Sequence, residues 1–255
     1  MRNLSKRWLC RAAALYCIGS AAVAQAQDAT LPFTPILTVG NVALQNDSVF
    51  ANADGSFTLL GNQQGGSFNG GAVWDLTWDL TLNQDPSIFG SLALTNLTTT
   101  TRNFTLSFLL PVSPAFSPSV FGGSLEATLM DANGDRSAAL APVAISPSIY
   151  RGQIDGATVL SLFALNLMCS GSTPGCMAHS DEEAGLPGLT LAGPGVFQNI
   201  STLLNFSLSP GDRVTFNTSF VVEPTSPVPL PAALPLLLSG LAFALRRRGV
   251  ALPAS

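Results

Sequence analysis

The sequence predicts an all-β protein built as one antiparallel β-sandwich of the jelly-roll or immunoglobulin-like kind. Two observations predict it. Short segments of alternating apolar and polar residues recur along the central part of the chain, separated by clusters of Gly, Pro, Asn, Asp and Ser. No long segment places apolar residues three and four positions apart, as an amphipathic helix requires. A closed barrel of the same strands is an alternative that the pattern leaves open.

The clearest predicted strand covers residues 74–82. Because successive side chains of a strand point to opposite faces, one face of this segment is apolar and the other is polar. The apolar face carries Trp74, Leu76, Trp78, Leu80 and Leu82, and the polar face carries Asp75, Thr77, Asp79 and Thr81. This alternation makes the two tryptophans core anchors.

The same alternation predicts further strands over residues 104–110, 125–129, 159–167, 200–208 and 214–222. Asn52-Ala53-Asp54-Gly55 has the composition of a hairpin loop, with Gly55 supplying a positive φ. Residues 209–212 form the turn before the last strand. We expect residues 170–195, which are rich in Gly and Pro, to form one long surface loop. The sandwich domain is predicted over residues 27–223.

The N-terminal segment has the order of a secretory signal peptide. Arg2, Lys6, Arg7 and Arg11 precede an uncharged apolar run over residues 12–23. Small residues at Ala24 and Ala26 then provide cleavage patterns, so residues 1–26 are predicted to be removed on export through the Sec translocon. The alternative, an uncleaved anchor, is disfavoured because the apolar run is shorter than the ~20 residues that span a membrane.

The C-terminal end mirrors this layout. Residues 224–227 are predicted to be a stiff linker. An apolar stretch over residues 230–245 follows, and arginines at positions 246–248 close it. As a helix this stretch is roughly 24 Å long, which is short of the ~30 Å hydrocarbon core. The arginines favour the cytoplasmic side of the inner membrane.

The tail over residues 228–255 resembles the PEP-CTERM sorting signals of Gram-negative bacteria, in the variant that begins VPLPA. The residues that carry the resemblance are Val228, Pro229, Leu230, Pro231 and Ala232, with the arginine cluster Arg246, Arg247 and Arg248. The resemblance implies processing by an exosortase, a membrane-embedded cysteine protease, and transient anchoring in the inner membrane. Leu230 stands where the commoner signal has Glu, which leaves the exosortase subtype open. A simple tail anchor is the alternative.

Without its two ends the domain is strongly acidic. All fifteen acidic residues lie between Asp28 and Glu223, against the arginines at positions 102, 136, 151 and 213, for a net charge of −11. A surface of this sign repels phosphate backbones and anionic headgroups, so nucleic-acid binding is the function class that the charge disfavours most, and we expect no nucleic-acid partner.

Cys169 and Cys176 are predicted to form a disulfide, because export places them in an oxidising compartment. The bridge closes a short ring and stabilises the fold by about 2.5 kcal/mol through the unfolded state. The alternative is a metal site that adds neighbouring ligands to the two thiols: His179, Asp181, Glu182 and Glu183. Zinc sites favour closer cysteine pairs with a second Cys or His pair, which this chain lacks.

Asp131, Asn133 and Asp135 form a weak calcium candidate, since oxygen-bearing side chains alternate as at the start of a calcium loop. The match then ends. Arg136 occupies the position of the turn glycine, and Pro142 stands in place of the bidentate Glu. We therefore favour a polar hairpin turn after a strand over residues 125–130.

The residues of common catalytic sites are missing, which predicts a protein that is not an enzyme and uses no cofactor. His179 is the single histidine, and no G-x-S-x-G elbow occurs. Asp75 and Asp79 would lie ~13 Å apart along one strand, beyond either separation used by glycosidases. No glycine-rich loop leads from a strand into a helix.

Two functions remain as expectations. The first is a structural or adhesive protein of the cell envelope or extracellular matrix, delivered by exosortase processing. The second is a carbohydrate-binding module of the envelope or exopolysaccharide matrix, in which Trp74 or Trp78 stacks on sugar rings. The alternation of these tryptophans with leucines favours the first function.

Overall fold

The computed structural model describes residues 31–67, 70–144, 146–172, 174–186, 188 and 190–225. The predicted signal peptide with Ala24 and Ala26 lies outside the described residues, as do the sorting motif from Val228 and the arginine cluster. No described residue belongs to a helix, so no described segment has the length and hydrophobicity of a membrane-spanning helix.

The described residues form two antiparallel sheets. The first sheet follows the order β11-β10-β15-β7-β1-β2, with β9 also beside β15 and β12 beside β9. Its strands are β1 (Ile36–Val39), β2 (Val42–Ala43), β7 (Arg102–Pro111), β9 (Ser137–Pro142), β10 (Tyr150–Ile154), β11 (Ala157–Leu162), β12 (Leu167–Ser170) and β15 (Asn199–Leu208).

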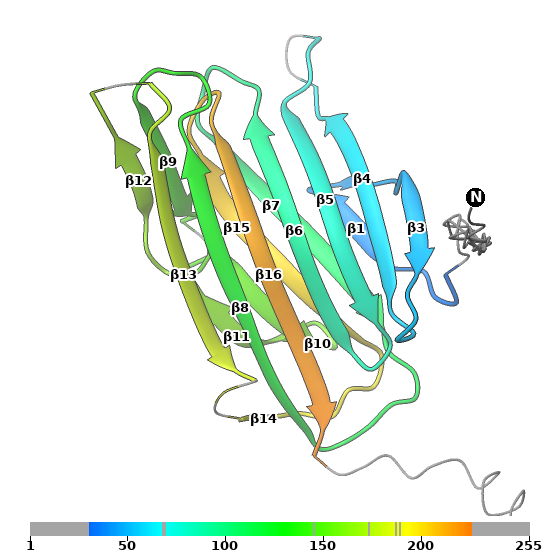
Figure 1. Ribbon diagram of the computed structural model, residues 1–255. Helices are drawn as coiled ribbons and strands as arrows, with labels where there is room; N and C mark the ends of the chain where they lie inside the picture. The colour runs from blue at the N-terminus through cyan, green and yellow to red at the C-terminus, as the bar shows by residue number, and fades with distance from the viewer. Residues whose placement is uncertain are drawn as a thin grey trace, which may run out of the picture.

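The second sheet follows the order β13-β8-β16-β6-β5-β4-β3, with β14 also beside β8. Its strands are β3 (Ser48–Ala51), β4 (Phe57–Gly65), β5 (Trp74–Asn83), β6 (Ser87–Asn96), β8 (Ser119–Met130), β13 (Met177–Gly185), β14 (Leu191–Gly193) and β16 (Arg213–Pro224). Figure 1 looks onto the outer face of this sheet, and the first sheet lies behind it.

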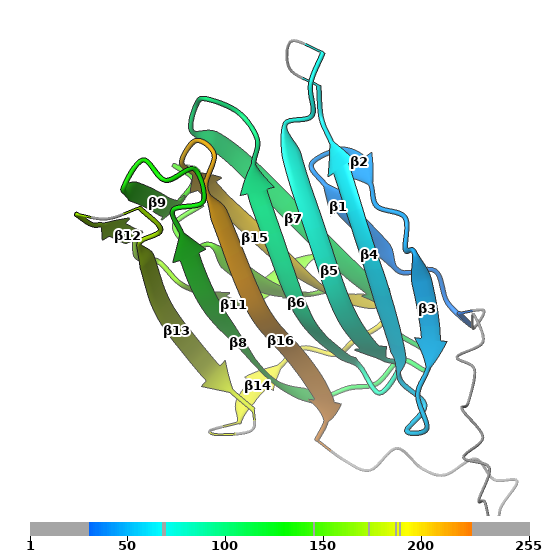
Figure 2. The same ribbon diagram turned by 45° about the horizontal axis from the view of Figure 1, so that its top comes forward.

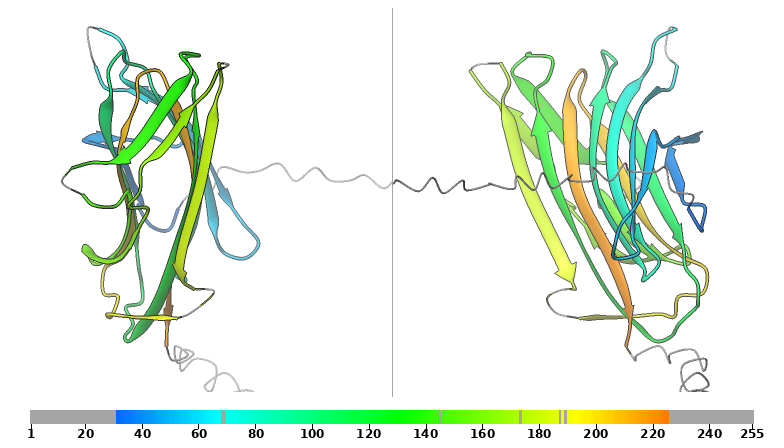
Figure 3. Two further views of the ribbon diagram at one scale, coloured as in Figure 1. Left: turned by 90° about the vertical axis from the view of Figure 1, so that its left-hand side faces the viewer. Right: turned by 45° about the vertical axis from the view of Figure 1, so that its right-hand side comes forward.

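The two sheets stack face to face as a β-sandwich, which the edge-on view of Figure 3 shows as two layers. The alternation-based strands are confirmed for β5, β7, β8, β15 and β16. The predicted hairpin loop is confirmed between β3 and β4, where Gly55 has a φ of 85°. The predicted turn at residues 209–212 leads from β15 in the first sheet to β16 in the second.

Two predictions about the chain between β11 and β15 were wrong. The segment 170–195 is not a single loop, because it contains β13 and β14, which pair with successive parts of β8. Strand β13 escapes sequence-based recognition because it is an edge strand with exposed polar residues and shows no apolar alternation. The strand predicted over residues 159–167 ends at Leu162, and the positive φ of Phe163 (66°) breaks it before β12.

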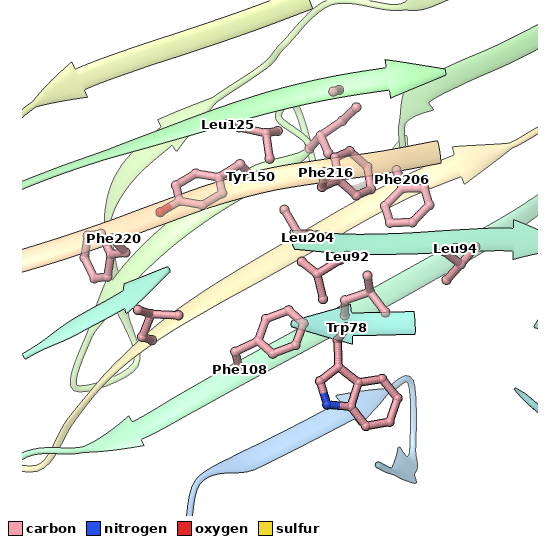
Figure 4. Close-up of a cluster of buried hydrophobic side chains, with 14 of the residues drawn as sticks. Trp78, Leu92, Leu94, Phe108, Leu125, Tyr150, Leu204, Phe206, Phe216 and Phe220 are labelled. Atoms are coloured by element: carbon pink, nitrogen blue, oxygen red, sulfur yellow. The ribbon is translucent and has the colours of Figure 1, made fainter. Parts of the chain in front are cut away.

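The core fills the space between the sheets with aromatic and aliphatic side chains from both (Figure 4). Phe206 of the first sheet lies 5.0 Å, ring centre to ring centre, from Phe216 of the second sheet. Tyr150 is fully buried, and its hydroxyl donates a 2.7 Å hydrogen bond to the backbone oxygen of Ser219. This bond ties β10 directly to β16 in the opposite layer.

Candidate functional site

The predicted sorting tail follows strand β16. This strand ends at Pro224, and the backbone N–H of Thr225 donates to the oxygen of Pro118 at 3.1 Å. Pro224, the first residue of the predicted linker, is therefore still part of the sheet. In Figure 2 β16 ends at the lower end of the sandwich, whereas β13 begins at the upper end. The last residues of β16 and the start of β13 therefore lie at opposite ends of the sandwich.

The predicted disulfide between Cys169 and Cys176 is present, with the two Cα atoms 5.9 Å apart. Cys169 lies in β12 at the edge of the first sheet, and Cys176 directly precedes β13 at the edge of the second sheet. The bridge therefore fastens the edges of the two layers to each other.

The alternative metal site around these cysteines is not formed. Both sulfur atoms are bonded to each other, and the carboxylate of Glu182 accepts a hydrogen bond from the backbone N–H of Phe163. His179 lies on the exposed edge strand, with Nδ1 3.2 Å from Thr128 Oγ1 and 3.8 Å from Glu126 Oε1. Within the part of the chain that the structure describes, no group of three or more His, Cys, Asp and Glu side chains has the arrangement of a metal site.

The calcium candidate is a loop anchored by its own backbone. The buried carboxylate of Asp131 accepts hydrogen bonds from the backbone N–H groups of Gly134, Asp135, Arg136 and Gly175. Asn133 donates to Asp135 and to the oxygen of Pro210. The predicted hairpin is wrong, because β8 and β9 belong to different sheets and this loop crosses between them.

This arrangement sets the charge state of Asp131. Burial of the carboxyl raises its pKa, but the N–H groups around it lower the pKa by more, so the pKa of Asp131 lies below its ordinary value. An ionised Asp131 holds the inter-sheet loop and the segment before Cys176 together. The arrangement serves the fold, because the oxygens that a cation would need already accept hydrogen bonds from the chain.

A second carboxylate with the same role escaped sequence analysis. Asp155 accepts hydrogen bonds from the backbone N–H groups of three consecutive residues, 197–199, at 2.8 to 2.9 Å. Asp155 and Gly156 both have a positive φ in the tight turn between β10 and β11. The sequence Asp155-Gly156 could have predicted this turn, since Asp-Gly is a strong mark of a two-residue β-hairpin.

The two tryptophans offered for sugar stacking are buried. Trp74 and Trp78 are each 3% exposed, and the indole N–H of Trp78 donates to Asn46 Oδ1 at 3.0 Å. Their interpretation as core anchors is confirmed, and neither forms a platform for a ligand.

A polar hollow lies on the outer face of the second sheet, over strands β5, β6 and β16. Its volume is about 260 Å³. Besides Trp78, whose side chain is buried, the lining residues are short hydroxyls and an alanine, with one carboxylate and one guanidinium: Thr77, Asp79, Ser91, Ala93, Thr215 and Arg213. No family model matches the chain, and no curated protein matches it. What the protein does is therefore inferred from its residues and their geometry.

Proposed function

We propose that the protein is an exported structural or adhesive component of the cell envelope or extracellular matrix, processed at its C-terminus by an exosortase. The observation that carries this proposal is the order of the tail: the VPLPA motif from Val228, the short apolar stretch, and Arg246 to Arg248. The cationic N-terminal segment with Ala24 and Ala26 supplies the matching export signal through the Sec translocon.

The short distance between the end of β16 and the sorting motif supports export followed by cleavage of the tail. Only residues 225–227 separate the end of β16 from the motif, which limits the span to about 10 Å. An anchored precursor would hold its folded domain outside the inner membrane, with the β16 end of the sandwich close to the protease. The disulfide between Cys169 and Cys176 fits the oxidising compartment to which export leads.

A binding or structural role fits the rest of the domain better than catalysis. His179, the single histidine, lies on an exposed edge strand, where the same ring nitrogen, Nδ1, faces both the Thr128 hydroxyl and the Glu126 carboxylate. A catalytic triad instead uses one ring nitrogen for the nucleophile and the other for the carboxylate. The acidic charge disfavours nucleic acid as a partner. Exopolysaccharide remains a candidate partner, but Trp74 and Trp78 cannot bind it by stacking because both are buried.

Replacing the arginine cluster tests the proposal in the source organism. We expect Arg246→Ala, Arg247→Ala and Arg248→Ala together to leave the precursor unprocessed, because the cationic stop that orients the tail is lost. Cell fractions would be probed for the full-length and shortened chains. Glu223→Gln, which lies before the linker, serves as the control and should be processed as the unaltered chain is. Normal shortening and release of the triple variant would contradict the proposal.

A further inference from the structure

The outer face of the second sheet carries an ordered array of short polar side chains over β5, β6 and β16. The pairing register aligns the outward residues of these strands in four rows: Asp75, Thr95 and Arg213; Thr77, Ala93 and Thr215; Asp79, Ser91 and Asn217; Thr81, Phe89 and Ser219. Rows lie about 7 Å apart and strands about 4.8 Å apart. Figure 1 shows the three strands side by side in the middle of the sheet.

The hollow described above lies at the centre of this array. Ala93 forms its floor because its side chain is shorter than those of Thr77 and Thr215 on either side. Asp79 from β5 and Arg213 from β16 contribute from opposite sides. Among the residues that the structure describes, the Asp79 carboxylate and the Arg213 guanidinium have no hydrogen-bond or ion-pair partner. Both charged groups are exposed and available to a ligand.

An aromatic ring lies beside the hollow on the same strand. Phe89 is 44% exposed and points outward from β6, two residues before Ser91. It is exposed in the middle of a sheet, where an outward position is usually polar. The ring lies one row, about 7 Å along the strands, from Ser91 and Asp79, and three rows, about 20 Å, from Arg213. A sugar unit packed on Phe89 is therefore close to the Ser91 hydroxyl and the Asp79 carboxylate, whereas Arg213 meets a later unit along β6.

The chemistry of this face selects the class of ligand. β5, β6 and β16 are internal strands whose backbone groups are paired on both sides, so a peptide cannot bind here by adding a strand. Asp75, Asp79 and the neighbouring Glu126 outnumber Arg213 on this face, so an anionic polymer would be repelled. A ligand that is rich in hydroxyl groups and has no net charge can form hydrogen bonds with the hydroxyl, carboxylate and guanidinium groups of this face without being repelled.

We propose that this face binds a neutral oligosaccharide along β6. Asp79 accepts hydrogen bonds from sugar hydroxyls, Arg213 donates to ring and hydroxyl oxygens, and Phe89 packs against the apolar face of one sugar ring. The path from Phe89 to Thr95 is about 20 Å long, which gives room for several sugar units. The proposal does not depend on tail processing, since it concerns the folded domain alone.

Isothermal titration calorimetry of the full chain in a detergent without sugar headgroups tests this site. The probes are three neutral pentasaccharides, of β-1,4-linked, β-1,3-linked and α-1,4-linked glucose, together with an oligomer of uronic acid and an unrelated peptide. We expect at least one neutral pentasaccharide to bind, and the uronic acid oligomer and the peptide not to bind. Absence of binding by all three neutral probes, or preferred binding of the acidic oligomer or the peptide, would overturn the proposal.

Matched variants locate the site. Asp79→Asn and Phe89→Ala should each weaken binding of the pentasaccharide at least about tenfold, and Arg213→Gln should do the same. Asp181→Asn is the control, because Asp181 lies in the same row of the same face but on β13, three strands away from β6. Circular dichroism confirms that each variant is folded. Equal affinity of Asp79→Asn and Asp181→Asn would place the sugar elsewhere and refute the site.

Discussion

Gly61 lies directly opposite Trp78 in the β4–β5 ladder, and its missing side chain makes room for the indole ring. A Cβ placed on Gly61 would lie 2.0 Å from Cζ2 of Trp78. The pattern repeats four residues on, where a Cβ on Gly65 would lie 2.3 Å from Cζ2 of Trp74. The two glycines allow both indoles to lie across β4 inside the sandwich.

The first prediction follows from this contact. Gly61→Ala should lower the free energy of unfolding by about 1–3 kcal/mol, because the added methyl group overpacks a buried ring. Urea unfolding followed by tryptophan fluorescence measures it. Asn62→Ala, the outward-facing neighbour, is the control and should change stability by less than about 0.5 kcal/mol. Equal stability of Gly61→Ala and the unaltered chain would mean that the indole does not lie over this strand.

The second prediction concerns acid sensitivity. The folded pKa of Asp131 lies below its ordinary value because the backbone N–H groups around it outweigh its burial. Its contribution to stability is therefore present above the unfolded pKa of about 3.9 and is lost as the pH falls through the lower, folded pKa. Asp131→Asn should be less stable than the unaltered chain at neutral pH, and the difference should shrink below about pH 4. Melting temperatures across this range would show a constant difference if Asp131 were not ionised in the fold.

Asp212 gives the third prediction, with the opposite sign. Burial raises the pKa of this carboxyl, the hydrogen bond from Ser209 opposes that rise, and the charges of Asp135 and Asp131 add to it. Its protonated form is therefore favoured by folding, and the associated stability is lost as the pH rises through the folded pKa. Asp212→Asn should remove this loss, so its melting temperature should fall less than that of the unaltered chain between about pH 4 and 7. Parallel pH profiles for the two proteins would contradict this assignment.

The fourth prediction tests the covalent link between the layers. Replacing Cys169 and Cys176 with Ser should lower the free energy of unfolding by about 2.5 kcal/mol. The largest increase in hydrogen exchange should occur in β12 and β13, whose edges the bridge joins. Reduction of the unaltered chain should reproduce both effects. Uniform exchange changes across the sandwich would indicate that the bridge does not hold these edges.

The strands that the sequence predicts best are those with one buried face and one solvent-exposed face. β5 and β16 show strict alternation, and both were predicted within two residues of their ends. β13 was missed because, among the described strands, it pairs with β8 alone at the edge of the sheet, and a strand that forms by pairing at an edge needs no apolar face of its own. Which strands share a sheet was not predictable either, because successive strands cross between the layers at residues 131–136 and 209–212.

The candidate site likewise depends on strand pairing that the local sequence does not reveal. Asp79 and Phe89 belong to no recognisable motif, and only the register of β5, β6 and β16 brings them onto one face with Arg213.

The role of Asn96 could not be predicted from the sequence either. Its buried side-chain nitrogen lies 2.9 to 3.0 Å from the backbone oxygens of Thr100, Leu208 and Ser209, a role that depends on pairing across more than a hundred residues.

The mass of the native protein tests export and tail processing most directly. The chain would be purified from the envelope and the medium of its source organism, and both of its ends would be determined by mass spectrometry. The account predicts a chain that begins after Ala26 and ends within or near residues 228–232, without the apolar stretch and the arginine cluster. A chain that still carries residues 233–255 and is recovered from the cytosolic fraction would contradict it.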